Sequence, residues 1–170
     1  MRRDDRHQLG RIPIGRAAID LSHSLTVTPQ SRRAHLDLTS RGVTAEVKDI
    51  PGWVNAFAQD GTFTDMSTGV TYRGETLGDV VEIYGTAFSD MHRELHRFYP
   101  SNDVVVVQLA LQGTQDGPLT LPTGTIPATG RRMDAPCCDV FELVDGKIKR
   151  FDCYPSGTVI MSQLGVLDSA

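Results

Sequence analysis

The stretch CCDVFELVDGKIKRFDCY, residues 137–154, decides the fold, because it is typical of two strands joined at an Asp-Gly turn. Apolar and polar residues alternate on both sides of the turn, as in a half-buried antiparallel hairpin. An odd-length loop with a glycine bulge would place six residues on one face. These are Cys137, Asp139, Phe141, Leu143, Phe151 and Cys153. That face is apolar except for Asp139, whose carboxylate we therefore expect to point inward.

A carboxylate on an apolar face is either paired with a cation or part of an active site, because an unpaired buried charge is costly. Arg93 is the candidate cation. It lies between Met91 and Leu95 and so has the parity of the apolar residues in its strand. A structural Arg93–Asp139 ion pair and a catalytic Asp139 are both open interpretations of the sequence.

Asp65 is a second candidate carboxylate. It follows Phe63 at strand spacing, so the two side chains share one face of the strand. Ser67 and Gly69 follow closely, which equally fits an exposed turn residue. Two inward carboxylates in one pocket would allow a division of labour between acid and base.

The rest of the chain predicts early helices followed by a run of antiparallel strands. We expect helices at 31–47, 49–57, 75–88 and 161–167. We expect strands within 61–74, on both sides of a turn, and at 91–99, 103–114, 131–143 and 147–154. The Gly/Pro/Thr-rich segment 117–130 is expected to lack regular structure. This order indicates an α+β fold, with a strongly curved antiparallel sheet wrapped over the helices around a central pocket.

Composition and charge narrow the class of protein. The 170 residues are 39% hydrophobic and 22% charged, which fits one soluble globular domain. Residues 1–35 hold seven arginines and three acidic residues, and the remainder holds ten basic and eighteen acidic residues. Because such an acidic body repels phosphates, we expect no nucleic-acid partner. Nor do we expect a membrane partner or a secretory signal, since no suitable apolar run is present.

We divide the chain into a poorly ordered extension, residues 1–30, and a domain, residues 31–170. Three cysteines do not make a disulfide framework and favour a cytoplasmic location. They also lack metal-ligand spacing and a nearby histidine, so we expect no metal and no cofactor. His92 and His96 do not form the HExxH pattern of a zinc protease, and we expect them on a solvated strand face.

Two stretches, DIPGWVNAFAQDGTFTD (49–65) and DVFELVDGKI (139–148), resemble ketosteroid isomerases. Three others resemble SnoaL-like polyketide cyclases: DGKIKRFDCYPSGTVIMSQLG (145–165), TGVTYRG (68–74) and GTQDGPL (113–119). Both groups belong to the NTF2-like superfamily of curved-sheet cone folds. The resemblance covers roughly residues 45–165 and implies an NTF2-like cone that forms a homodimer through its outer sheet face.

The isomerase resemblance implies that Asp65 is the proton-shuttling base and that Asp139 is a protonated acid hydrogen-bonded to the enolate. Some positions depart from the family patterns. The isomerase tyrosine donor is matched by Arg41, and the cyclase acid/base aspartate by Cys153. The cyclase histidines are matched by Asp139 and Gln115.

We therefore predict a cofactor-independent isomerase or cyclase that acts on a hydrophobic, polyketide- or steroid-like carbonyl compound, with Asp65 and Asp139 as catalytic residues. The expected substrate-binding residues are Trp53, Phe63, Tyr84, Phe88, Arg93, Gln115, Phe141, Phe151 and Cys153. One alternative is a non-catalytic NTF2-like binding or dimerisation module, with a fixed Arg93–Asp139 ion pair and a solvated Asp65. Another is an epoxide hydrolase of the same fold that uses Asp65, Arg93 and Asp139.

Overall fold

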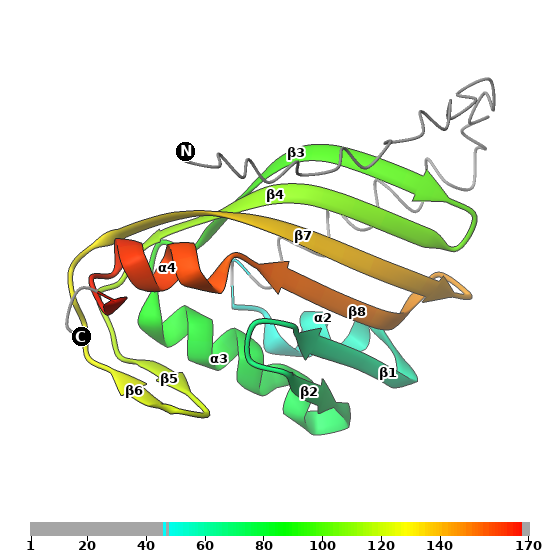
Figure 1. Ribbon diagram of the computed structural model, residues 1–170. Coiled ribbons are helices and arrows are strands. Elements are labelled where there is room, and N and C mark those ends of the chain that lie inside the picture. Colours follow the sequence, from blue (N-terminus) through cyan, green and yellow to red (C-terminus); the bar gives the residue numbers. More distant parts are fainter. Residues whose placement is uncertain (1–45, 47, 168–170) are drawn as a thin grey trace, which may run out of the picture.

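The structure is a computed structural model that describes residue 46 and residues 48–167. The predicted extension at 1–30 and the predicted helix at 31–47 lie outside these residues, except for Glu46. Figure 1 shows one large curved sheet with α2 and α3 together beneath it.

Six strands form the large sheet, in the order β2-β1-β8-β7-β4-β3. They are β1 (Phe57–Asp65), β2 (Val70–Arg73), β3 (His92–Ser101), β4 (Val104–Thr114), β7 (Arg132–Val144) and β8 (Lys147–Pro155). Neighbouring strands are antiparallel, except that β1 and β8 are parallel. The sheet is curved, as Figure 1 shows. It ends at the edge strands β2 and β3 and is therefore open.

The helical segments are α2 (Ile50–Asn55), the short 3-10 helix η1 (Gly74–Thr76), α3 (Leu77–Ala87) and α4 (Gly157–Gln163). Asp49 caps α2 by accepting a hydrogen bond from the backbone N of Gly52 at 3.0 Å, as its place before a proline predicts. Among the described residues, no helix is long and apolar enough to cross a membrane.

Three predicted elements differ from the structure. The helix after Asp49 ends at Asn55, and Phe57 begins β1. Segment 117–130 contains a small hairpin, β5 (Leu119–Leu121) with β6 (Gly124–Ile126), because Leu119 is an apolar anchor with only 1% of its surface exposed. The last helix begins at residue 157 and not at 161. The remaining elements lie within four residues of their predicted bounds.

The hairpin of β7 and β8 has the predicted face, but for a different reason. Asp145 and Gly146 have φ of 48° and 73°, so they form a two-residue turn with both residues left-handed. The one-residue shift in register between β7 and β8 comes from a bulge in β8. Leu143 pairs with Ile148, but Glu142 pairs with Arg150. All six predicted residues are buried or half-buried.

Aromatic rings fill the core beneath the sheet. Trp53 on α2 contacts Phe57, Phe63 and Phe151 edge-on, and its indole N donates to the carbonyl of Leu77 at 2.7 Å. That hydrogen bond joins α2 to the start of α3. It therefore fixes the position of the aromatic residues that lie beside the site.

Strand β4 has the two faces that its sequence predicts. Val105, Val107, Leu109 and Leu111 are buried, while Val104 on the outer face is 37% exposed. Dimerisation through this outer face stays a prediction.

Candidate active site

A cavity of about 100 Å³ lies between the large sheet and α3. Asp65 from β1, Asp139 from β7 and Tyr84 from α3 all contribute to its wall. The other lining residues are Glu46, Lys48, Trp53, Phe63, Val80, Val81, Gly85, Met91, Arg93, Leu111, Phe151, Cys153 and Pro155. Both predicted catalytic residues thus share one cavity with six of the predicted binding residues.

Asp65 ends β1 and is 4% exposed. Its Oδ1 accepts hydrogen bonds from the backbone N and the hydroxyl of Ser67, at 2.9 and 2.7 Å, and from the backbone N of Thr68 at 3.3 Å. Its Oδ2 accepts from the hydroxyl of Tyr84 at 2.9 Å. Asp65 is therefore both the turn residue and the inward carboxylate that the sequence left as alternatives. The solvated Asp65 expected for a non-catalytic module is wrong.

Tyr84 lies on α3, and its hydroxyl donates the hydrogen bond to Asp65 on β1. Burial first, and then the charge of Asp65 and the hydrogen bond to it, raise the pKa of Tyr84 well above the ordinary value of 10.0. Tyr84 is therefore a neutral phenol that donates to the carboxylate at any working pH.

This raised pKa gives a test of the contact. Neutral Tyr84 contributes fully to stability below its unfolded pKa of about 10, and this contribution is lost as the pH rises toward the folded pKa. We therefore expect the free energy of unfolding to fall above about pH 10, and less steeply in Tyr84→Phe. Urea unfolding from neutral to alkaline pH measures both slopes. Tyr99→Phe, at a position that is 44% exposed, is the matched control; equal slopes for the two variants would contradict the contact.

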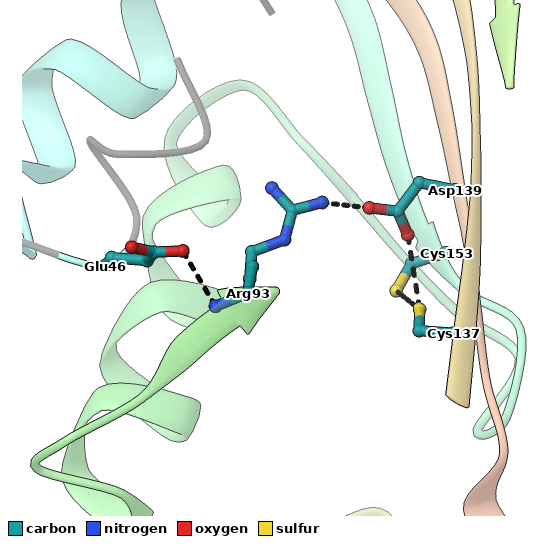
Figure 2. A network of polar contacts seen from close by, with 5 residues as sticks. All are labelled: Glu46, Arg93, Cys137, Asp139 and Cys153. Atoms are coloured by element: carbon teal, nitrogen blue, oxygen red, sulfur yellow. Dashed lines mark hydrogen bonds and ion pairs between the residues drawn. The ribbon is translucent and has the colours of Figure 1, made fainter. Parts of the chain in front are cut away.

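Arg93 and Asp139 form a buried ion pair, which Figure 2 shows. Asp139 has no exposed surface, and its Oδ2 accepts a hydrogen bond from Nη2 of Arg93. The backbone N of Arg93 donates to Oε1 of Glu46 at 2.9 Å. Burial is the largest single effect on the Arg93 guanidinium and lowers its pKa. Asp139, together with neighbouring groups that include Glu46, more than offsets burial, so the pKa is raised and Arg93 stays charged. The ion-pair interpretation of the sequence is confirmed.

Asp139 acts as an acceptor in these contacts. Its second oxygen, Oδ1, lies 3.4 Å from Sγ of Cys137, which donates to it. Asp139 thus accepts from Arg93 through one oxygen and from Cys137 through the other. The contacts therefore favour a positioning role for Asp139, which holds the Arg93 guanidinium in the cavity wall.

Cys153 lines the cavity beside this pair. Its Sγ lies 3.5 Å from Sγ of Cys137. The hydrogen bond with Cys137, together with burial and the charge of Asp139, raises the pKa of Cys153 well above the ordinary value of 9.0. Cys153 is therefore a neutral thiol and not a nucleophilic thiolate.

Three predicted binding residues lie outside the cavity wall. Gln115 is fully buried, and its amide N donates to the carbonyls of residues 117, 126 and 127 while its oxygen accepts from Thr129 at 2.7 Å. Gln115 therefore fastens the loop that follows β4. Phe88 pairs with Gln115 and has no exposed surface. Phe141 packs behind the wall residue Phe151, with ring centroids 4.1 Å apart.

The cavity wall also contains residues that the sequence did not single out. Val80, Val81 and Leu111 have the spacing of buried residues, which does not distinguish a cavity wall from packed core. Glu46 and Lys48 precede α2, at and just after the end of the helix predicted at 31–47, and no sequence pattern assigned them a role in a site. Tyr84 was a predicted binding residue, but no spacing rule links it to Asp65, 19 positions earlier.

The family comparison agrees with this architecture. The model of the SnoaL-like domain matches residues 43–151. The chain belongs to the SnoaL-like domain family. A search of curated proteins found no match. The predicted family resemblance is therefore confirmed.

Solved structures share the fold of this SnoaL-like protein. A candidate SnoaL-like polyketide cyclase from Jannaschia sp. CCS1 is 20% identical with a TM-score of 0.67, over 82% of this chain and 94% of that one. A hypothetical protein from Catenulispora acidiphila with a ketosteroid isomerase-like fold, in complex with trimethylamine, is 18% identical with a TM-score of 0.64, over 76% and 92%. An LEH-like epoxide hydrolase of M. tuberculosis is 15% identical with a TM-score of 0.60, over 82% and 98%. The predicted NTF2-like cone is confirmed.

Proposed function

We propose that the protein is a cofactor-independent enzyme that isomerises or cyclises a small hydrophobic carbonyl compound by moving a proton through an enolate. The observation that carries this proposal is the buried carboxylate of Asp65, which shares the wall of one largely apolar cavity with the charged guanidinium of Arg93. A base and a fixed positive charge are the two groups that enolate formation requires.

Asp65 is the proposed general base. It removes a proton from the carbon next to the carbonyl, and the C–H electron pair moves through the α-carbon to the carbonyl oxygen. In isomerisation the same carboxyl then returns the proton to the far carbon of the shifted double bond. The neutral hydroxyl of Tyr84 holds Oδ2 in place during both transfers.

Arg93 is the proposed partner of the enolate oxygen. Its planar guanidinium has five N–H donors, and Asp139 engages one of its amino groups. Asp139 therefore fixes the orientation of the guanidinium, and the remaining donors can meet the developing charge. A charge that is already oriented costs little reorganisation in the transition state.

The size of the cavity selects the substrate. A cavity of roughly 150 Å³ holds a ring the size of benzene, and this cavity measures about 100 Å³. Because the cavity is smaller than that, we propose that only the reacting edge of a single ring, or the reacting end of a longer polyketide-like molecule, enters it. Phe63, Phe151 and Trp53 would contact that ring.

The isomerisation of 3-cyclohexenone to its conjugated isomer tests the proposal, because the product is followed by its ultraviolet absorbance. We expect the full chain to accelerate the reaction at least about 100-fold over buffer, the low end of the range for a positioned acid or base, and to remain active with a chelator present. Exchange of the α-hydrogens in D₂O, followed by NMR, gives an independent readout. Binding of the ketone without either reaction would support the non-catalytic module instead.

The two other predicted functions differ in what they require of Asp65. An epoxide hydrolase would need the carboxylates of Asp65 and Asp139 both arranged around Arg93. Here the carboxylate of Asp65 accepts from Tyr84 instead. Among the described residues, only the carboxylate of Asp139 accepts from the guanidinium. A non-catalytic module also predicts the fixed Arg93–Asp139 pair, but it predicts a solvated Asp65 as well, whereas Asp65 is only 4% exposed and lines the cavity. The geometry therefore favours proton transfer.

A further inference from the structure

Cys137, Asp139 and Cys153 form a cluster whose two thiols the proposed proton transfer does not use. Their sulfur and oxygen atoms lie within 4.8 Å of one another. Figure 2 shows the two sulfurs and Oδ1 of Asp139 converging on one another. The hairpin creates the cluster, because Cys137 and Asp139 share a face of β7 and Asp139 pairs with Cys153 on β8.

Two of the three separations between the ligand atoms fit a tetrahedral site, and the third, between Cys153 and Asp139, is within 4.8 Å. Zinc lies about 2.3 Å from a thiolate sulfur and about 2.0–2.2 Å from a carboxylate oxygen. The edges of such a tetrahedron are about 3.8 Å between two sulfurs and about 3.5 Å between sulfur and oxygen. The observed separations are 3.5 Å between the two sulfurs and 3.4 Å between Cys137 Sγ and Asp139 Oδ1. Small shifts of the side chains would complete the site.

We propose that this cluster binds one thiophilic divalent cation, Zn²⁺ or Cd²⁺, through the sulfurs of Cys137 and Cys153 and Oδ1 of Asp139. Two of these ligands, Asp139 and Cys153, line the cavity, so the fourth coordination position faces it. Three protein ligands with one open position is the arrangement of zinc sites that accept a further small ligand. The proposal does not rest on the isomerase function.

The charges of the side chains around the cluster also favour a divalent cation. Arg93 binds Oδ2 of Asp139 and leaves Oδ1 toward Cys137. Binding of the cation releases the two thiol protons to solvent. The two thiolates and the carboxylate then carry three negative charges, and the divalent cation with Arg93 carries three positive ones. The loaded site is therefore neutral, as the metal-free site with two thiols and an ion pair also is. Neutrality in both states avoids the cost of an uncompensated buried charge.

A disulfide between Cys137 and Cys153 fits the same atoms less well. Cys137 pairs across the strands with Pro155, and Cys153 pairs with Asp139, so the two cysteines are diagonal neighbours. Diagonal pairs have Cα atoms about 7–8 Å apart, whereas disulfides need about 4.4–6.8 Å. A metal ion spans the wider distance, since each sulfur stays more than 2 Å from it.

Titration of the reduced full chain with Cd²⁺ tests the site, because thiolate–cadmium bonds absorb in the ultraviolet. We expect saturation at one equivalent and displacement of Cd²⁺ by excess Zn²⁺. Cys153→Ala and Cys137→Ala should each bind at least about 100-fold more weakly, since even residues that only support a ligand change affinity about 10–100-fold. Circular dichroism confirms the fold of each variant.

Cys138→Ala is the matched control. Cys138 is adjacent in sequence but on the other face of β7, and it does not belong to the cluster. It should bind Cd²⁺ like the unmodified chain. No absorption at one equivalent, or an equal loss of binding in Cys138→Ala and Cys153→Ala, would overturn the proposal. If either cluster variant does not fold, Asp139→Asn keeps both thiols and should still weaken binding; unchanged affinity there would equally overturn it.

Discussion

Replacing Asp65 by asparagine should slow the isomerisation of 3-cyclohexenone at least about 100-fold, since a positioned base contributes roughly 10² to 10⁴-fold. The amide cannot take up the proton, but it keeps the shape of the side chain. Its oxygen can still accept from Ser67, and its NH₂ can donate to the hydroxyl oxygen of Tyr84, so the turn and the cavity persist. The loss is therefore expected in kcat and not in the binding of the ketone.

Asp152→Asn is the control for this variant. Asp152 is as buried as Asp65, with 4% of its surface exposed, but it accepts from Arg150 at 2.6 Å and does not line the cavity. We expect its activity to match that of the unmodified chain. Steady-state kinetics and thermal unfolding of both variants separate chemistry from folding. A loss below tenfold in Asp65→Asn would exclude Asp65 as the base.

The hairpin of β7 and β8 shows how much of a local structure the sequence pattern can predict. Alternation and an Asp-Gly pair predict two strands and the face that carries Asp139, and the structure has both. The parity of Arg93 predicts its pairing with that carboxylate, although β4 lies between their strands. Such predictions succeed because a strand has a strict period of two and a buried charge needs a partner.

The sequence does not predict the contacts that depend on tertiary packing. Nothing local indicates that Tyr84 reaches Asp65, or that Gln115 turns away from the cavity to bond three carbonyls. The spacing of the cysteines argues against a metal site, yet strand register places two of them around Asp139. Ligand spacing rules describe loops and helices, and they do not consider side chains that strand register brings together.

Replacing Arg93 by methionine should lower the free energy of unfolding by about 3–5 kcal/mol, because removing one partner of a buried pair leaves the other charge uncompensated. Asp139 has no exposed surface and Arg93 exposes only 14% of its side chain, so water cannot take the place of the guanidinium. For a chain of this size the loss corresponds to a fall in Tm of roughly 6–20 °C. Urea unfolding at neutral pH measures the free energy directly.

The double variant Arg93→Met with Asp139→Leu separates the cost of a lone charge from the contribution of the pair. Replacing a whole buried pair by apolar residues is often neutral, so we expect the double variant to be more stable than Arg93→Met alone. Lys149→Met breaks an ion pair with Asp60 whose partners are 44% and 73% exposed, and it should leave stability unchanged. If Arg93→Met is as harmless as Lys149→Met, then water reaches Asp139 and the guanidinium is not its essential partner. The proposed stabilisation of the enolate would then lose its fixed charge, because a guanidinium that Asp139 does not hold cannot be oriented in advance.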